Sequence, residues 1–333
     1  MAIVTGELVT YSTIGRREDL EDTIWDLFPM DTYLVSNLDK VDATGTFHEW
    51  LNDGLEAATL NAQLEGDDAS YASVAQAVRM GNYTQISRKA FTVSGTVEAV
   101  KKAGRKSEIT RQLMKQMKEW KRDVEKALCG RAASSAGSQN APRTSGGMES
   151  WIASTDHGGN GIRATSTVSF STVGFSSGVV TAPADGVTAS ASTLVVANLT
   201  AALTEAWTDG GDPRVIITGA FQRAIIDGFT SIATRFVDVD AQGGGGKGVP
   251  IIGSAGVYMS DFGKHVLILS RYVRTNQVLC IDPDYWAQAW LRRPTVETLA
   301  KTGDGEKRMI IGEFCLVARN PESSAKIGGL KDV

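Results

Sequence analysis

The sequence predicts an α+β fold in which one long helix packs against a β-sheet. Three patterns support this: an apolar stripe of helical spacing between residues 109 and 128, alternation over residues 84–98, and an apolar run at 308–318. The chain has 333 residues, of which 42% are hydrophobic and 22% charged. These are the proportions of an ordinary globular protein, and they exclude a wholly disordered chain.

Before residue 100 the sequence predicts an amphipathic helix and then a long hairpin-like arm. Leu20, Ile24 and Leu27 share one helical face, and Pro29 ends the helix because the residue before a proline disfavours helical backbone. The arm consists of two strands around an acidic excursion with few large apolar side chains, which we expect to be exposed. The ranges are 17–28 for the helix, 45–53 and 84–98 for the strands, and 54–81 for the excursion.

The clearest predicted helix covers residues 106–129. Ser107 is a candidate N-cap and Gly130 a candidate stop. The other faces of this helix are basic, but no aromatic residues interleave with the cations, so a solvated or partner-facing surface is the ordinary alternative to a DNA contact. Apolar residues recur at steps of three and four and form one stripe, which we expect to be the core face of the helix: Ile109, Leu113, Met117, Trp120, Val124 and Leu128.

Beyond the long helix the predicted elements are short. Residues 131–192 are rich in Ser, Thr, Gly and Ala and predict short strands joined by loops. Asn198 is a candidate cap of a helix with Leu199, Leu203 and Trp207 on one face. The later elements are a strand at 215–218, a helix with Phe221, Ile225 and Phe229 aligned, a loop at 243–246, strands near 256–262, 265–273 and 277–281, and a strand at 308–318 that is apolar on both faces and hence central.

The formal net charge of −4 hides a strong asymmetry along the chain. Residues 1–80 carry 4 basic and 15 acidic side chains, residues 81–131 carry 13 and 5, and the remainder carries 17 and 18, so the blocks have net charges of −11, +8 and −1. Blocks of opposite sign can pair within one chain or between chains. Two solvated faces that happen to differ are the simpler alternative. There is no global basic excess that argues for nucleic-acid binding.

The catalytic and metal-binding motifs of the chain are incomplete. Ser176 lies in a Gly-x-Ser-x-Gly sequence, but the residues after it are not helical, as a nucleophile elbow requires. The glycine run at 243–248 lacks the Ser or Thr of a phosphate loop, and residues 238–249 lack two ligands of a calcium loop. The three cysteines and three histidines are scattered, so we expect no metal site and no organic cofactor.

No feature of the sequence indicates a membrane. The first residues lack the basic and apolar regions of a signal peptide, and the longest uncharged stretches are rich in Ser and Thr. The scattered cysteines favour a reducing compartment over a disulfide framework.

A series of short motifs resembles one known family. The motifs are Arg-Arg-Glu-Asp-Leu at 16–20, Phe-Pro-Met-Asp-Thr at 28–32, Thr-Phe-His-Glu-Trp at 46–50, Leu-Glu-Gly-Asp-Asp-Ala at 64–69, Arg-Met-Gly-Asn-Tyr-Thr-Gln-Ile-Ser-Arg-Lys at 79–89, Val-Ser-Gly-Thr at 93–96, Lys-Ala-Gly-Arg-Lys-Ser-Glu at 102–108, Asp-Pro-Asp-Tyr-Trp at 282–286 and Leu-Ala-Lys-Thr-Gly-Asp-Gly-Glu-Lys-Arg at 299–308. This ordered series resembles the major capsid proteins of tailed bacteriophages, in the branch of SU-ten-like major head proteins.

The resemblance implies the Hong Kong ninety-seven type capsid fold. It also implies a structural protein, not an enzyme, that self-assembles into hexamers and pentamers of an icosahedral phage head around double-stranded DNA. The implied partners are further copies of the chain, a portal protein and separate scaffolding and decoration proteins, and the implied place of assembly is the host bacterial cytoplasm. The implied domains are an N-terminal arm (1–40), an extended loop with flanking strands (41–98), a peripheral domain with a long spine helix (99–150), an axial domain (151–285) and return strands of the peripheral domain (286–333).

In the resembled fold the extended loop lies over a neighbour's peripheral domain, so the two charge blocks are expected to meet between subunits. Two alternatives remain open: a shell protein of a bacterial protein compartment with the same fold, and a serine hydrolase that uses Ser176 with His265 as a base. The acidic loop residues are Glu49, Asp53, Glu56, Glu65, Asp67 and Asp68, and the basic partners are Arg88, Lys89, Lys101, Lys102, Arg105 and Lys106.

Overall fold

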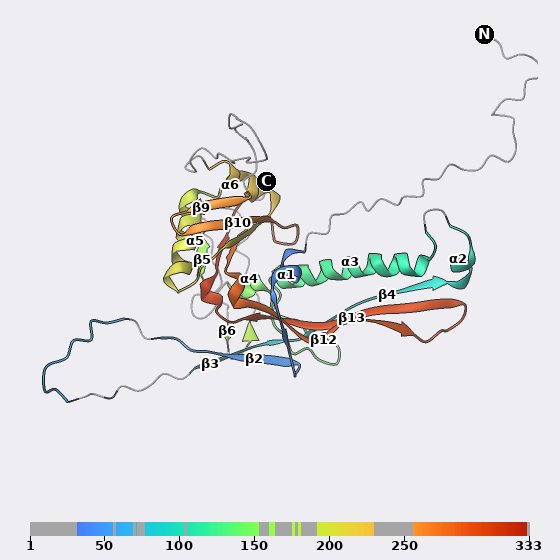
Figure 1. Ribbon diagram of the computed structural model, residues 1–333, viewed down its shortest axis with the longest axis horizontal. Helices are drawn as coiled ribbons and strands as arrows, with labels where there is room; N and C mark the ends of the chain where they lie inside the picture. Colours follow the sequence, from blue (N-terminus) through green and yellow to red (C-terminus); the bar gives the residue numbers. More distant parts are fainter. Residues whose placement is uncertain are drawn as a thin grey trace, which may run out of the picture.

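Two large sheets, one long helix and a projecting hairpin dominate the described part of the fold (Figure 1). The predicted helix at 17–28 lies outside the described residues, as do residues 153–159 and the glycine-rich, phosphate-loop and calcium-loop segments between 238 and 249. The computed structural model describes residues 32–55, 58–68, 71, 77–102, 105–152, 160–163, 175–176, 179–180, 192–229 and 256–331.

The first sheet has four strands in the order β1-β12-β13-β4. β1 runs parallel to β12, and the other neighbouring strands are antiparallel. β13 lies between β12 and β4 over most of its length, which confirms the prediction of a central strand near residues 308–318. The bounds are Asp39–Asp42 for β1, Gln85–Ser94 for β4, Trp286–Leu299 for β12 and Gly305–Ala318 for β13.

The long helix α3 (Glu108–Cys129) lies along this sheet (Figure 1). Ser107 is its N-cap, as predicted, because its Oγ accepts a hydrogen bond of 3.3 Å from the Thr110 N–H. The helix approaches β13 closely at one point, where a Cβ on Gly312 would lie 2.8 Å from Trp120 Cζ2. Glycine at this position therefore leaves room for the indole ring between helix and sheet.

The predicted stripe of α3 is buried except at one turn. Ile109, Trp120, Val124 and Leu128 belong to the core, and Leu113 packs against it. The prediction is wrong for Met117, whose side chain is 40% exposed. Periodicity identifies a face of a helix, but burial also needs a neighbouring element that covers each residue of that face.

The second sheet has six strands in the order β5-β14-β11-β8-β10-β9. β8, β9, β10 and β11 confirm the strands predicted near 215–218, 256–262, 265–273 and 277–281, with β9 at one edge of the sheet. The last strand, β14, pairs with β11 and β5, so the expectation that all of 286–333 returns to the long-helix sheet is wrong for this segment. The bounds are Asn160–Arg163 for β5, Val215–Thr218 for β8, Val257–Ser260 for β9, Gly263–Leu269 for β10, Val278–Ile281 for β11 and Ala325–Gly328 for β14.

Two helices accompany the second sheet, and both depart in detail from the sequence prediction. In α5 (Val196–Thr208) Leu199 and Leu203 are buried as expected, but Trp207 is 62% exposed and stacks on Phe262 at the surface. The N-cap of α5 is Val195, so Asn198 lies inside the helix instead of capping it. In α6 (Ala220–Asp227) the buried apolar residue is Ile226, whereas Phe221 is partly exposed.

Short helical turns occupy several connections. Residues 95–99 form the turn α2, so the strand predicted over 84–98 ends at Ser94, where Gly95 N–H bonds to the Asp304 carbonyl instead of continuing the ladder. The short helices are α1 (Tyr33–Asn37), α2 (Gly95–Ala99), α4 (Met148–Trp151), η1 (Pro283–Tyr285) and η2 (Pro321–Ser323).

One hydrophobic core joins the two sheets. It contains Trp120 from α3 and Phe314 from β13 together with Ile217 and Leu279 from the six-stranded sheet, and Trp286 of the same cluster is fully buried. A second cluster fills the space under α5, and a small third cluster lies around Ala287, Ala289, Cys315 and Val317. Because the largest cluster is shared, burial of apolar surface holds the two sheets together.

Candidate assembly surfaces

The base of the projecting arm is a hairpin of β2 (Phe47–Asn52) and β3 (Val78–Tyr83). The predicted strand at 45–53 is confirmed, but the return strand is β3 and not 84–98, so the excursion ends before Val78. A Cβ on Gly81 would lie 2.5 Å from Phe47 Cζ, so the Phe47 ring fills the space beside that glycine. The Trp50 ring lies 5.5 Å from the Trp151 ring and fastens the arm to the core.

Beyond Asn52 the arm extends away from the body of the subunit (Figure 1). The described residues there have no helix or strand, and they expose large apolar side chains: Leu55 by 101%, Leu60 by 100%, Leu64 by 80% and Tyr71 by 97%. Sets of exposed apolar side chains on one segment mark an interaction site. The leucines are not among the site residues predicted above, although their spacing of four or five residues is a signal visible in the sequence.

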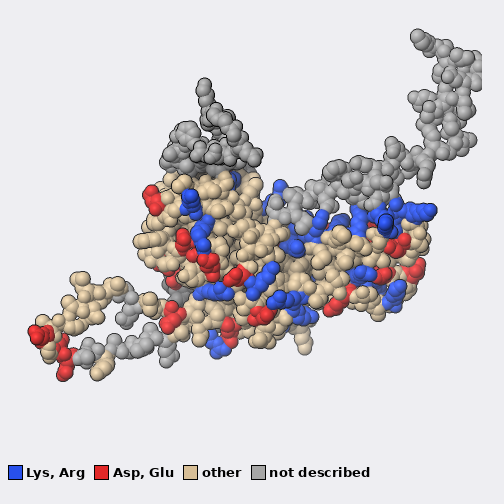
Figure 2. Space-filling model, viewed as in Figure 1, with Lys and Arg blue, Asp and Glu red and all other residues tan. Residues whose placement is uncertain are grey.

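The tip of the arm is acidic, as Figure 2 shows by its red side chains. Asp53, Glu65, Asp67 and Asp68 are exposed. Glu49 differs from them because it forms an ion pair with Arg79 across the β2–β3 hairpin. Glu56 lies outside the described residues.

The predicted basic partners fall into two groups. Lys89 pairs with Asp123 at 2.8 Å, Lys102 pairs with Glu98 at 3.5 Å, and Arg105 pairs with Glu108. The latter two pairs follow from side chains three or four residues apart in sequence. Each of these three cations thus has a carboxylate partner in its own chain, and its expected contact with another subunit stays a prediction. The other three, which make no ion pair with any described residue, are exposed: Arg88, Lys101 and Lys106.

A buried carboxylate fixes the start of the described chain. Glu125 of α3 accepts hydrogen bonds of 2.9 Å from the N–H groups of Leu34 and Val35, so both oxygens hold the first turn of α1. Gln288 donates to the Leu34 carbonyl at 2.9 Å. Burial raises the pKa of Glu125, against the lowering effect of these N–H donors. The sequence analysis did not single out this residue, because its partners are backbone groups about ninety positions away.

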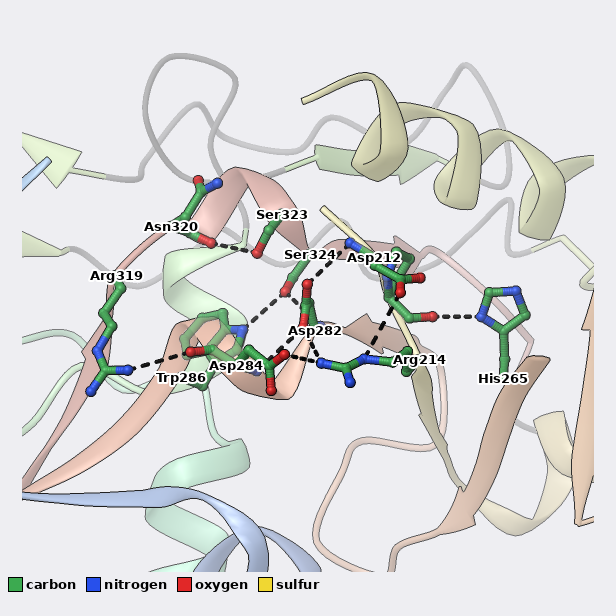
Figure 3. Close-up of polar contacts among 11 residues, drawn as sticks. Asp212, Arg214, His265, Asp282, Asp284, Trp286, Arg319, Asn320, Ser323 and Ser324 are labelled. Carbon is green, nitrogen blue, oxygen red and sulfur yellow. Dashed lines mark hydrogen bonds and ion pairs between the residues drawn. The ribbon is translucent and has the colours of Figure 1, made fainter. Parts of the chain in front are cut away.

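A polar network lies at the junction of the two sheets (Figure 3). The Asp282 carboxylate accepts from the Asp212 N–H at 3.0 Å and from the Asp284 N–H at 3.2 Å. Arg214 lies between the carboxylates and pairs with both Asp282, at 3.3 Å, and Asp284. The turn predicted around Pro283 is therefore confirmed as η1, and its acids tie β8 to the entrance of β12.

The connection from β13 to β14 passes through the same junction (Figure 3). Ser324 Oγ accepts from Trp286 Nε1 at 2.9 Å and from the Asp282 N–H at 3.2 Å. Arg319 donates to Asp39 Oδ2 at 3.5 Å and to the Asp284 carbonyl at 3.4 Å. The connection that leaves the six-stranded sheet after β11 and the one that returns to it as β14 are thus bonded to each other.

The hydrolase alternative gains no support from the backbone around Ser176. Ser176 ends β6 (Phe175–Ser176), and the next described residues form the paired strand β7 (Val179–Val180), where an elbow needs a helix. His265 is buried, with its Nε2 at 2.6 Å from Ser260 Oγ and its Nδ1 against the Pro213 carbonyl. Burial lowers the pKa of His265.

The described part of the chain offers neither a metal-binding cluster nor a membrane-spanning helix. No group of three or more His, Cys, Asp or Glu side chains there is arranged to hold a metal ion. None of its helices has the length and apolar character needed to cross a bilayer.

The two-sheet architecture with a long helix and a projecting arm is that of Hong Kong ninety-seven type capsid shells. The chain of the cyanophage A-1(L) capsid has a TM-score of 0.64 at 13% identity, with 97% of this chain and 98% of that chain covered. The SrpI encapsulin of Synechococcus elongatus PCC 7942 has a TM-score of 0.53 at 10% identity, with 100% and 98% covered. At such identities these likenesses establish the fold alone, which confirms the predicted fold class.

The model of the SU10 major capsid protein family matches residues 4–331, so the chain belongs to this family of phage major capsid proteins. The major capsid protein of Escherichia phage Phieco32 is 28% identical over 334 residues, which cover 95% of each chain. The family that the motif series indicated is therefore confirmed, and with it the role of the chain as a building block of a phage capsid.

Proposed function

We propose that this capsid protein forms hexamers and pentamers that close into an icosahedral head around double-stranded DNA. Assembly takes place in the host bacterial cytoplasm, with a portal protein and with separate scaffolding and decoration proteins. The observation that carries this proposal is the arm, which exposes Leu55, Leu60 and Leu64 almost completely in the single subunit. A segment that buries none of its leucines on its own chain needs the surface of a neighbour.

The compartment-shell alternative receives less support. An encapsulin shares the fold, but the family match is to phage capsid proteins. The two functions differ in what the shell encloses. We expect shells purified from infected cells to contain nuclease-resistant DNA, and shells filled with an enzyme and free of DNA would favour the compartment.

Opposite charges on the arm and on the body support the orientation of the subunits. The arm tip presents Glu65, Asp67 and Asp68, and Asp53 lies nearer its base. The body presents Arg88 on β4 and Lys101 and Lys106 between α2 and α3. We propose that the arm tip of one subunit meets these three cations of its neighbour, whereas Lys89, Lys102 and Arg105 add positive potential while keeping their own partners.

The energy of each such contact is small, but the number of contacts is large. An exposed ion pair contributes about 0.2–1 kcal/mol. Three pairs for each arm, repeated around every capsomer, disfavour docking in a wrong register, because like charges would then face each other. In this proposal the leucines of the arm supply affinity and the acids supply orientation.

Charge reversal tests the pairing directly. The variant Arg88→Glu, Lys101→Glu, Lys106→Glu changes the cations that lack an ion pair among the described residues, so it breaks no ion pair between described residues. We expect this variant to stop assembly of empty shells in electron micrographs. Adding Glu65→Lys, Asp67→Lys and Asp68→Lys to the same chain should restore part of the assembly.

A matched control reverses three exposed cations elsewhere: Lys121, Lys264 and Lys301. This control should form shells normally, because it changes the net charge by the same amount without touching the proposed contact. Normal shells from the first variant would refute the pairing, and failure of the control would show that net charge alone governs assembly.

A further inference from the structure

A basic groove of about 500 Å³ lies beside α3, separate from the arm. Figure 2 shows Lys and Arg side chains gathered along the region that α3 occupies in Figure 1. Two acids, Glu119 and Asp123, and Tyr272 complete the lining. The five cations that line the groove are Lys89, Lys115, Arg122, Lys126 and Arg271.

Three elements bring these cations together. Lys115, Arg122 and Lys126 lie at steps of seven and four along α3, so they share one face of the helix. β4 supplies Lys89, and the segment after β10 supplies Arg271. With five cations and two acids the described lining of the groove has a formal charge of +3, in a chain whose total charge is −4.

Contacts within the groove hold part of the lining in place. Lys89 pairs with Asp123 at 2.8 Å, and Arg122 Nε donates to the Tyr272 hydroxyl at 3.0 Å. Lys115 and Glu119 are 3.9 Å apart, at the limit of an ion pair, and Lys126 and Arg271 are exposed. The acids therefore position cations and leave a net positive surface for an anionic partner.

We propose that this groove binds the phosphodiester backbone of the packaged double-stranded DNA. The inference rests on the proposed function, because it requires that the shell encloses DNA. Phosphate contacts need only cations and hydrogen-bond donors and carry no sequence information, which suits a protein that must accept a whole genome. The groove is thus a non-specific contact on the inner side of the shell.

The composition of the lining favours DNA over an acidic segment of another subunit. Protein interfaces are anchored by buried apolar and aromatic side chains. Among the described residues that line this groove there is no aliphatic side chain, and the aromatic residue there, Tyr272, has its hydroxyl bonded to Arg122. A second groove, of about 440 Å³, differs in this respect, because Val35, Trp120 and Trp290 line it.

The test measures binding of the unassembled full chain to a random-sequence duplex by fluorescence anisotropy over a range of salt concentrations. The groove variant is Lys115→Gln, Lys126→Gln, Arg271→Gln. Each lost phosphate contact lowers the slope of log K against log salt by about 0.9, so three lost contacts lower it by about 2.7. The control Lys121→Gln, Lys264→Gln, Lys301→Gln removes the same charge outside the groove and should keep the wild-type slope.

Shell formation by the same variants provides a second readout. We expect the groove variant to form empty shells like the wild type, because the contact is with DNA and not with a neighbour. Unchanged DNA affinity and slope would overturn the inference, as would an equal loss in groove variant and control. Loss of shell assembly with DNA binding intact would assign the groove to a protein partner. If wild-type shells themselves fail to enclose DNA, the proposed function fails first, whatever the groove variant does.

Discussion

Replacing the three most exposed leucines of the arm by serine should weaken assembly without weakening the subunit. The variant is Leu55→Ser, Leu60→Ser, Leu64→Ser. These side chains are 101%, 100% and 80% exposed, so they contribute almost nothing to the fold of their own chain. Full burial of one leucine contributes about 1.5–3 kcal/mol. If a neighbour covers half of each side chain, the variant loses about 3 kcal/mol per arm.

The assay follows light scattering against protein concentration and checks the product for closed shells by electron microscopy. A loss of 3 kcal/mol corresponds to a roughly 100-fold weaker contact, since about 1.4 kcal/mol is a factor of ten. The concentration at which shells appear should rise accordingly, while the thermal midpoint of the unassembled subunit stays within about 2 °C, as expected for surface substitutions.

A control variant replaces three exposed apolar side chains outside the arm. It distinguishes an effect of the arm leucines from a general effect of lower surface hydrophobicity. Val195, Leu269 and Val296 are 48%, 48% and 42% exposed and lie outside the arm. Their replacement by serine should leave the assembly concentration near the wild-type value. The reasoning is refuted if the arm variant assembles at the wild-type concentration, or if the control shifts as far as the arm variant does.

Three further predictions concern the subunit itself. Gly211→Ala should lower the thermal midpoint of the subunit by several degrees, because the new Cβ would lie 2.5 Å from Ser323 Cα and overpacking costs about 1–3 kcal/mol. Gly256→Ala is the control and should leave the midpoint unchanged, because its Cβ would have no atom within 4 Å. All three cysteines are buried and free, and burial raises the pKa of Cys280 and Cys315 to about 12, so a thiol reagent should label them only after denaturation; rapid labelling of folded protein would contradict this. Burial raises the pKa of Glu125 above its ordinary 4.5, so the carboxyl group stabilises the fold fully below pH 4.5 and loses this contribution as the pH rises through its pKa in the folded state. Calorimetry from pH 4 upward should show this loss of stability in the wild type and not in Glu125→Gln. Parallel curves of stability against pH for the two proteins would disprove it.

Local patterns were enough to predict the elements that carry their own signal. The long helix has an N-cap at Ser107 and six apolar residues in register, and β13 lies between two neighbours with apolar residues on both sides of Gly312 and Glu313. The errors arose where burial depends on partners distant in sequence. Met117 and Trp207 sit on apolar faces whose neighbours do not extend over them. β14 has four residues, too few for a period, and its place is set by pairing with β11 and β5.

The assembly surfaces were predicted in part. The acidic tip follows from composition, because charged side chains without a buried partner stay in water. The ion pairs of Lys102 and Arg105 could have been predicted, because Glu98 and Glu108 lie four and three residues away from them in the sequence. The net charge of a block of residues does not contain this spacing, so it does not show which charges pair within the chain. The clamp of Glu125 on α1 could not be derived, because backbone N–H groups carry no mark in a sequence.

Two connections of the chain run side by side between the two sheets, and together they limit how the sheets can move. One crossing runs from Ile281 to Trp286 and the other from Ala318 to Ala325, and Ser324 bonds to residues of the first crossing. Two adjacent connections beside one shared hydrophobic core resist twisting and separation of the two sheets. A subunit built this way passes a load on one sheet to the other through both connections, so it enters a capsomer as one mechanical unit.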